Sequence, residues 1–245
     1  MLSFLKNHPF AVEAFFESSL VLTYAVEKEE LQNKIPPCLE LDTFRDRWAF
    51  VAVAMVKTKG LRPKGTPSFL GNDFFLTGYR IFVRYSTSYG KRLRGLYILG
   101  SETDKKKMAF FGNIFTNYNY KTTDVLIENS DDIIRIQSVQ SALDVEVKLS
   151  QGSKLPPGSP FTDWKEARRF AGPLPFTFTY NEVKKEVLII EGVRENWEPK
   201  PVEVIKHQVG FIDKLHCSNI VLANAFLIQN IPYWWKKGRR DPWKV

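Results

Sequence analysis

The feature that most constrains the fold is a succession of short β-type segments that runs through almost the whole chain. Each segment is rich in aromatic and β-branched residues, which pack well on a pleated sheet. About ten such segments are present: 18–26, 47–56, 77–86, 93–100, 132–140, 143–150, 176–181, 186–193, 200–211 and 225–235. Some gaps between them have the length of a turn, such as NEVKKE at 181–186, which predicts hairpins and mostly antiparallel pairing.

Helical patterns are few. They cover residues 26–35, 104–118 and 161–172. Pro36 and Pro37 end the first because a proline ring is incompatible with helix continuation, and Thr162 is the expected N-cap of the last. The stretch GSKLPPGSP at 152–160 is a loop, but similar strands continue after it. We therefore expect one domain over residues 1–245. Its class is mainly β (α+β), with a large antiparallel sheet that is curved or closed into a barrel around a ligand cavity.

The composition is that of a soluble globular protein, with 44% hydrophobic and 25% charged residues. Only two cysteines are present, Cys38 and Cys217, so we expect no disulfide framework and a reducing compartment. No run reaches the roughly 18 apolar residues of a membrane span, and the N-terminus lacks the pattern of a signal peptide. These features predict a cytoplasmic protein.

The net charge is +8, and much of the excess lies in KKGRR at 236–240. Aromatic and basic residues together can bind single-stranded nucleic acid, and a basic patch can also bind an anionic membrane surface. An aromatic strand followed by a solvated basic tail, residues 236–245, explains the same residues with fewer assumptions. We therefore rank nucleic-acid or membrane-surface binding third, below two small-molecule hypotheses, and expect no nucleic-acid partner.

The segment DKKKMAFFGNIFTNY at 104–118 is amphipathic if it is helical, with Asp104 or Thr103 as its N-cap. A helical period gives it one broad apolar face: Met108, Phe110, Phe111, Ile114, Phe115 and Tyr118. Lys107 falls on this face in the first turn. There the helix dipole, neighbouring lysines and partial burial would lower the pKa of its amine and make it a better nucleophile. The alternative, which we favour, is that Lys107 buries only its stem and keeps its ammonium in water.

The segment GYRIFVRY at 78–85 carries two arginines on one face. The period of two in a strand puts Arg80 and Arg84 together with Phe82, opposite Tyr79, Ile81, Val83 and Tyr85. Two guanidiniums on one face can hold a carboxylate or a phosphate. A solvated outer face is the simpler interpretation, and the residues alone favour it.

The sequence contains no recognisable motif for a metal or a nucleotide. Its three histidines, His8, His207 and His216, lack the spacing of a zinc site. A P-loop, a G-x-G-x-x-G fingerprint and a G-x-S-x-G elbow are all missing from it. We therefore expect neither a metal nor a cofactor.

The stretch KIPPCLELDTFRDRWAFVAVAMVKTKGLRPKG at 34–65 resembles the uncharacterised YqjF-like family of the acetoacetate decarboxylase-like superfamily. The resemblance continues through YRIFVRY at 79–85 and RGLYILGSETDKKKMAFFGNIFTNYNYKTTDV at 94–125, and more loosely through FTFTYNEVKKEVLIIEGVRENW at 176–197. It covers about residues 17–200, and the proline pair with LELDTF is its most specific element. It implies a β-rich fold with a closed, cone-like antiparallel barrel around a pocket and a helix in the pocket wall.

In acetoacetate decarboxylases a lysine of a Y-P-K-K segment forms a Schiff base with the substrate ketone. Aligning this segment with YNYK places Tyr118 on the tyrosine, Tyr120 on the first lysine and Lys121 on the second. The first lysine is the Schiff-base residue of the family pattern, so the resemblance implies that Tyr120 stands in its place. Lys121 would have to act from one residue away, where a strand points it to the opposite face.

Other positions of the family pattern are met only in part. Arg80 and Arg84 match its Y-R-I-F-V-R segment, which raises their functional weight. The F-x-E-x-N pattern that precedes this segment in YqjF-like proteins is FFLTG here, so Leu76 and Gly78 replace an acid and an amide.

Two small-molecule hypotheses follow. The first is a protein that binds a small organic ligand of the carboxylate or keto-acid type in the barrel cavity, without Schiff-base catalysis. Its expected ligand contacts are Arg80, Arg84, Tyr118 and Tyr120. The second is a lysine-dependent decarboxylase or lyase that acts on a keto acid through Lys121 or Lys107. The sequence leaves open whether the protein forms homo-oligomers.

Overall fold

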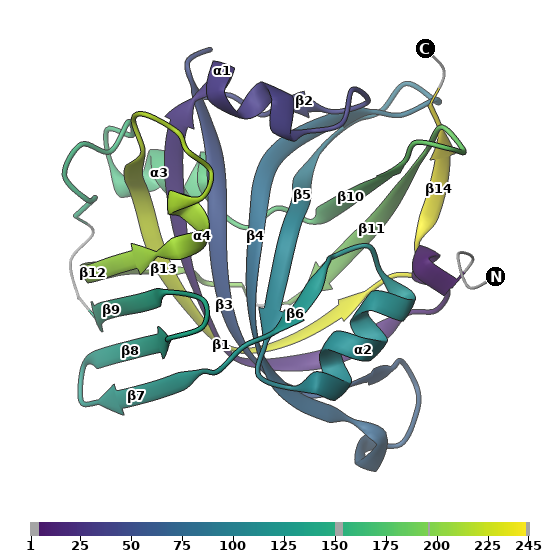
Figure 1. The fold of residues 1–245 in the computed structure, drawn as a ribbon, viewed down its shortest axis with the longest axis horizontal. Helices are drawn as coiled ribbons and strands as arrows, with labels where there is room; N and C mark the ends of the chain where they lie inside the picture. The colour runs from purple at the N-terminus through teal and green to yellow at the C-terminus, as the bar shows by residue number, and fades with distance from the viewer. Residues whose placement is uncertain (1–4, 150–153, 196, 244–245) are drawn as a thin grey trace.

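The computed structural model describes residues 5–149, 154–195 and 197–243 (Figure 1). Its strands are β1 (Val12–Glu27), β2 (Glu40–Leu41), β3 (Trp48–Pro63), β4 (Asn72–Ser86), β5 (Arg92–Thr103), β6 (Tyr120–Thr122), β7 (Leu126–Ser130), β8 (Ile133–Ser138), β9 (Leu143–Leu149), β10 (Phe176–Asn181), β11 (Glu186–Arg194), β12 (Lys200–Val209), β13 (Val221–Trp235) and β14 (Arg239–Pro242). Its helices are α1 (Lys28–Leu31), α2 (Lys106–Phe115), α3 (Trp164–Ala171) and α4 (Gly210–Asp213), with 3₁₀ turns η1 (Leu5–Asn7), η2 (Gln32–Lys34) and η3 (Ser68–Leu70).

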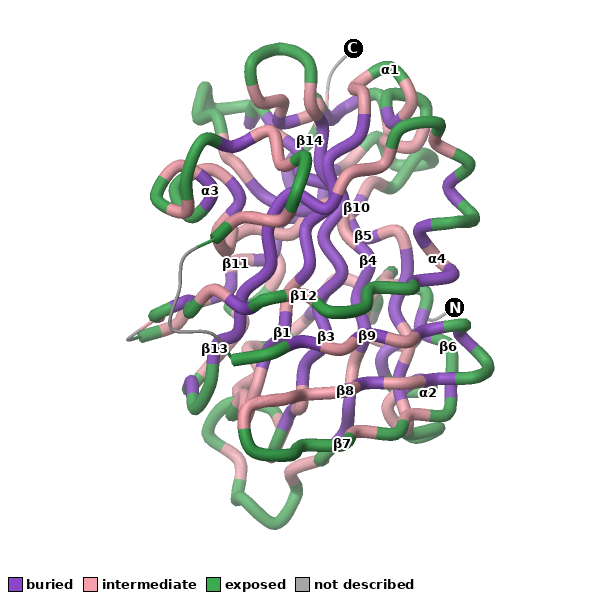
Figure 2. Tube along the Cα trace, turned by 90° about the vertical axis from the view of Figure 1, so that its left-hand side faces the viewer, coloured by how far each residue is buried: buried purple, intermediate pink, exposed green. Residues whose placement is uncertain are grey.

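The long strands form a closed ring. In the order β11-β10-β5-β4-β3-β1-β13 each strand pairs with the next, and β11 also pairs with β13. We call this set the strand ring. Strands β12, β9, β8 and β7 continue the sheet beyond β13 and lie across the outer face of β1 and β3 (Figure 2). This closure leaves the ring with an inner face and an outer face, and the outer face is covered by a second layer.

The mainly β class expected from the sequence is confirmed, and each of the ten predicted segments contains a strand. The predicted hairpin at 181–186 is also present, because β10 and β11 pair antiparallel with Asn181 opposite Glu186. Two pairings are parallel, however, since β6 and β10 both run parallel to β5. Each of these strands follows a helix, α2 or α3, and a crossover connection of this kind allows parallel pairing. The sheet is therefore mixed.

Side chains alternate between the two faces of the ring, as the period of two requires. On the outer face, Leu22, Val53 and Ile81 join one core with Val145 and Val147 of β9. The residues between them point to the inner face, which includes Phe82, Arg80 and Arg84 of β4. From the residues alone, a solvated outer face was the favoured interpretation for these arginines. That interpretation is wrong for Arg80, which lies inside the ring, whereas Arg84 stays 31% exposed beside Asp42.

Helix α3 covers one end of the inner face. Phe50, Phe82, Phe161 and Ala167 form a compact apolar cluster there, in which the rings of Phe50 and Phe161 stack with centroids 5.5 Å apart. The expected N-cap shifts by one residue, from Thr162 to Asp163, whose carboxylate accepts the Glu166 N–H at 2.8 Å. We call this region the filled end of the ring.

The helix at 104–118 is present as α2, but the expected apolar face is only partly correct: Met108 and Phe115 line the interior of the ring, and the most closely packed residues are different ones. Phe110 and Phe111 are 64% and 43% exposed, whereas Ala109 and Gly112 are buried. The helix packs through its small residues because they allow close approach to the strand beneath. No side chain caps its N-terminus, because the expected cap Asp104 accepts the Phe75 N–H instead, at 2.8 Å.

The C-terminal segment is not a solvated tail over its described residues. Residues 239–242 form β14, which pairs with β11. Asp241 is buried and accepts hydrogen bonds from Tyr85 Oη at 2.6 Å, Ser88 Oγ at 2.6 Å and Ser88 N at 2.9 Å. A buried carboxylate with several hydrogen-bond donors is stabilised as an anion. Asp241 therefore anchors the basic stretch to the sheet. Over the described residues, none of the helices has the length and hydrophobicity needed to cross a bilayer.

Candidate functional site

The other end of the inner face is hollow because small side chains line it. Ala52 and Ala54 of β3 lie opposite Arg80 and Gly78 of β4. The resulting cavity has a volume of about 230 Å³, and we call this region the hollow end. On the same two strands, Phe50 and Phe82 occupy the corresponding positions at the filled end. The size of the side chains alone therefore separates a packed core from a cavity.

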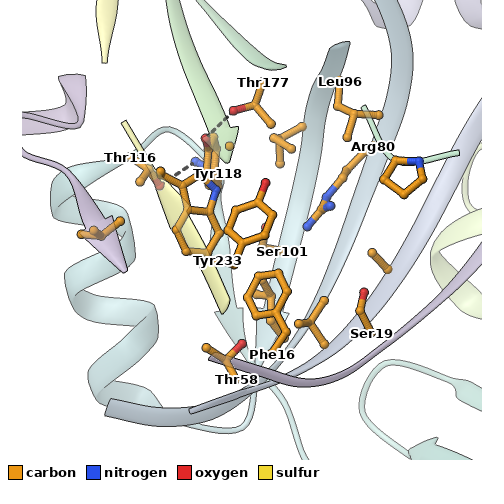
Figure 3. A pocket seen from close by; sticks show the side chains of 18 of the residues that line it. Phe16, Ser19, Thr58, Arg80, Leu96, Ser101, Thr116, Tyr118, Thr177 and Tyr233 are labelled. Carbon is orange, nitrogen blue, oxygen red and sulfur yellow. Dashed lines mark hydrogen bonds between the residues drawn. The ribbon is translucent and has the colours of Figure 1, made fainter. Parts of the chain in front are cut away.

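The wall of the cavity is apolar apart from a few groups. Its charged or titratable residues are His8, Arg80, Tyr118, Tyr120, Arg194 and Tyr233. The hydroxyl-bearing residues of its wall are Ser19, Thr58, Ser101, Thr116 and Thr177 (Figure 3). Within the described part of the chain, no lysine, aspartate, glutamate or cysteine lines it. Its fixed charge is therefore positive.

Arg80 is the central polar group. Its side chain folds back along its own strand over Gly78, where an added Cβ would lie 3.0 Å from both Nε and Nη2. Arg80 is partly exposed and lines the cavity (Figure 3). Its Nε is buried, and no described residue accepts a hydrogen bond from it. No carboxylate among the described residues forms an ion pair with it. Burial lowers the pKa of Arg80 from its ordinary value, which is the behaviour of a cation without a counter-ion.

Three phenols surround this guanidinium: Tyr118, Tyr120 and Tyr233. Burial raises the pKa of Tyr118 to about 12 and also raises the pKa of Tyr120, while the Arg80 charge opposes both shifts. Burial raises the pKa of Tyr233 in the same way. The Tyr118 hydroxyl is hydrogen-bonded to Thr177 Oγ1 at 3.0 Å. All three phenols are therefore neutral near pH 7 and can donate a hydrogen bond.

Glycines make room for two of these tyrosines, as Gly78 does for Arg80. A Cβ at Gly112 of α2 would overlap the ring of Tyr120, and a Cβ at Gly192 would overlap the hydroxyl of Tyr233. Asn113 fixes the backbone of Tyr120, because its amide accepts the Tyr120 N–H at 2.8 Å and donates to the Tyr120 carbonyl at 2.9 Å. The only sequence signal for these positions is an isolated glycine inside a strand or helix pattern, which indicates close approach of another group.

The two predicted arginines differ. Arg84 lies outside the cavity, and its Nε donates to Asp42 Oδ1 at 2.5 Å. Arg94 Nε donates to the other oxygen of the fully buried Asp42 at 2.6 Å, and its Nη2 donates to the Phe170 carbonyl at 2.9 Å. Arg84 therefore has a structural partner, whereas no described residue forms an ion pair with Arg80.

The two predicted lysines also lie outside the cavity. Lys121 follows Tyr120 in β6, and it is exposed whereas Tyr120 is buried and lines the cavity. Lys107 is exposed in the first turn of α2. The alternation along a strand accounts for the first case, and the changed packing face of α2 accounts for the second.

Three charged or titratable groups of the described wall were not predicted from the sequence: His8, Arg194 and Tyr233. His8 Nδ1 is buried without a partner, and burial lowers the pKa of this side chain. Arg194 Nη2 donates to the Pro173 carbonyl at 2.7 Å, and its guanidinium lies 4.2 Å from the centroid of the Trp197 ring. These residues come from the N-terminus and from the ends of β11 and β13, so no local motif connects them.

The described residues contain no group of three His, Cys, Asp or Glu side chains able to hold a metal ion. Tyrosine, arginine and histidine are the groups that the cavity offers for chemistry. They can bind an anion, donate hydrogen bonds and, at His8, accept a proton.

Comparisons with known proteins agree with this fold. The model of the family DUF2071, described as an uncharacterized conserved protein, matches residues 14–237. No curated protein matches the chain. An acetoacetate decarboxylase from Legionella pneumophila has a similar structure, with a TM-score of 0.60 at 13% identity over 95% of this chain and 87% of that one.

Two further structures are similar. The enduracididine biosynthesis enzyme MppR, complexed with pyruvate, has a TM-score of 0.57 at 8% identity, with 95% of this chain and 90% of that chain covered. An acetoacetate decarboxylase-like enzyme from Sphingomonas wittichii has a TM-score of 0.51 at 10% identity, with 98% and 92% covered. These likenesses confirm the acetoacetate decarboxylase-like fold that the sequence resemblance implied.

Proposed function

The chain belongs to the DUF2071 family and has an acetoacetate decarboxylase-like fold, and from this premise we propose that it binds a small organic carboxylate at Arg80 inside the strand ring. The unpaired guanidinium of Arg80 carries this proposal. A cation held deep in a protein without a counter-ion is unfavourable, and an anionic ligand removes that penalty. A planar guanidinium also matches the two oxygens of a carboxylate.

The surrounding groups support the same ligand. The neutral phenols of Tyr118, Tyr120 and Tyr233 can donate to its oxygens, and no acidic side chain of the described wall repels it. MppR was solved with pyruvate, which is itself a carboxylate. Arg84 has no part in this proposal, because Asp42 already neutralises it.

We further propose that binding proceeds without a Schiff base. The described wall contains no lysine, and Tyr120 occupies the position that the family resemblance assigns to the nucleophile. The partner is accordingly a small molecule. A cytoplasmic location stays a prediction from the sequence. The possible formation of homo-oligomers has the same standing.

Isothermal titration tests the anion site. Keto acids and larger carboxylic acids are each compared with the corresponding neutral amide. We expect binding of the acid form only, weakened about tenfold to a hundredfold in Arg80→Met, because a hydrogen bond to a charged group contributes about 1.5–3 kcal/mol. Lys121→Met removes one exposed positive charge and is the matched control. Equal binding of acid and amide, or unchanged binding in Arg80→Met, would contradict the proposal.

Borohydride trapping tests the absence of a Schiff base. The protein is incubated with acetoacetate or pyruvate and sodium borohydride and is then analysed by mass spectrometry. We expect no covalent adduct. A reduced adduct mapped to Lys121 or Lys107 would instead support the lysine-dependent decarboxylase or lyase.

A further inference from the structure

We propose that the ligand of the hollow end is a monocarboxylate with an uncharged, apolar body, either a medium-chain acyl group or one aromatic ring on a short chain. This inference rests on the proposed function, because it takes Arg80 as the anchor of the carboxylate. It adds the class of molecule that fills the rest of the cavity, and it separates that class from short keto acids, dicarboxylates and amino acids.

The charges of the wall allow one anionic group and no cationic group. Among the described residues, Arg80 has no ion-pair partner, whereas Arg194 is already held by the Pro173 carbonyl and the Trp197 ring. A second carboxylate would therefore have to compete with existing contacts. No aspartate or glutamate of the described wall could accept a hydrogen bond from an ammonium, so an amino acid would leave its charge unpaired.

The surroundings of Arg80 define where the carboxylate lies. Because the side chain folds over Gly78, its guanidinium lies at the level of Gly78 and of its strand partners Ala54 and Ser101. The Ser101 hydroxyl lines the cavity at this level and can donate to the carboxylate. The anion site is therefore at the inner part of the hollow end, next to the filled end.

Beyond this level the wall is mainly apolar, although Ser19 and Thr58 add hydroxyl groups to it. Along β3 and β4 it is lined by Val56, Leu76 and Phe74, and α2 contributes Phe111 and Phe115. The distance from Gly78 to Phe74 along the strand is about 13 Å, at about 3.3 Å per residue. An extended ligand with its carboxylate at Gly78 thus places its body among hydrocarbon side chains.

The volume of the cavity sets the size of the body. An apolar cavity of roughly 150 Å³ is enough to hold benzene, and this one has about 230 Å³. A carboxylate with one ring and a short chain therefore fits. A short keto acid would leave most of the apolar wall in contact with water or empty space. It would therefore lack the favourable free energy of removing apolar surface from water.

A homologous series of acids tests the proposal by isothermal titration. The series is butanoate, hexanoate, octanoate and decanoate, with 3-phenylpropanoate as the aromatic member. We expect the affinity to rise about fourfold per added methylene until the cavity is full, because burying one methylene contributes about 0.8 kcal/mol. Phenylalanine, which adds only an ammonium to 3-phenylpropanoate, should bind at least tenfold more weakly, and suberate more weakly than octanoate.

Two variants locate the effect. Val56→Phe fills the apolar part beyond Gly78, at the level of Leu76, and should remove the dependence of the affinity on chain length. Ser19→Val, at the same level on β1, is a milder change with the same expected direction. Lys121→Met, outside the cavity, should leave the whole series unchanged. If the affinity rises as steeply with chain length in Val56→Phe and Ser19→Val as in the unchanged protein, the placement of the body is wrong.

The outcomes separate this inference from the proposed function. If pyruvate or acetoacetate binds as tightly as octanoate and Arg80→Met abolishes both, the apolar class is wrong and the anion site stands. If octanoate and octanamide bind equally, Arg80 is not the anchor and both proposals fail. Absence of binding by every acid of the panel also overturns both.

Discussion

The filled and hollow ends of the strand ring use the same strands in opposite ways. At the filled end, Phe50 and Phe82 pack against α3, and Arg84 is neutralised by Asp42. At the hollow end, Ala54 and Gly78 occupy the equivalent positions, and Arg80 has no ion-pair partner among the described residues. The two arginines are four residues apart on one face of β4, so their difference comes entirely from residues on other elements. A buried arginine thus has a structural or a binding role according to what the neighbouring strands supply.

The largest expected effect comes from removing a ring at the filled end. Phe50→Ala should lower the free energy of unfolding by about 3–5 kcal/mol, because it removes a buried aromatic side chain and leaves a cavity. Urea denaturation measures the loss. The reverse change at the hollow end, Ala54→Leu, should alter stability by less than about 1 kcal/mol, since the added atoms enter existing space. Similar losses for both variants would mean that the two ends are packed alike.

The second largest effect is expected from the ion pairs of the filled end. Asp42→Asn should destabilise the protein by about 2–4 kcal/mol, because Arg84 and Arg94 both lose their counter-ion. This range lies somewhat below the value for fully buried pairs, since both arginines are partly exposed. Chemical denaturation at low and high salt measures the effect. A loss below about 0.5 kcal/mol would show that this network contributes no more than a surface pair.

Arg80→Met should raise the free energy of unfolding, in contrast to the two substitutions at the filled end. We expect the ligand-free protein to gain about 1–2 kcal/mol of stability, because the substitution replaces an unpaired cation by an apolar chain of similar length. Arg84→Met, four residues away, is the matched control and should lose stability because Asp42 then keeps one partner instead of two. If both substitutions destabilise the protein equally, Arg80 has a structural partner and the contrast between the ends fails.

The smallest expected effect is a dependence of the stability on pH, and it arises from His8 at the hollow end. Burial lowers the pKa of His8 below its ordinary value of 6.5, so protonation favours the unfolded chain. This contribution to stability is present above about pH 6.5 and is lost as the pH falls from there through the folded pKa, with a slope of at most about 1.4 kcal/mol per pH unit. Denaturation curves between pH 7.5 and pH 5 measure it. His8→Gln should flatten the profile, and an unchanged slope in this variant would assign the effect to another group.

Much of the fold could be predicted because its signals are local. Aromatic and β-branched residues marked the ten long strands, and the period of two placed Arg80, Phe82 and Arg84 on one face. The short strands β2, β6, β7 and β14 were missed, since two to five residues hold too little pattern. The face of α2 was predicted only in part, because close packing buried Ala109 and Gly112 while Phe110 stayed exposed.

The candidate site was predictable only in part. The family resemblance drew attention to Arg80, Tyr118 and Tyr120, which line the cavity. His8 and Tyr233 were missed because they are more than 200 positions apart in the sequence, and neither lies in a motif. A cavity wall is formed by contacts between distant segments, and a single sequence contains no direct record of those contacts.

By itself, the sequence determined the strands, their alternation and the set of residues that share each face, because these depend on neighbours a few positions away. Only the tertiary structure decided that the ring closes over Arg80, that α3 fills one end, and that Asp42 pairs with Arg84 while no described residue forms an ion pair with Arg80. The physical reason is that burial and charge pairing depend on distances in space, and these are set only when segments far apart in the chain pack together.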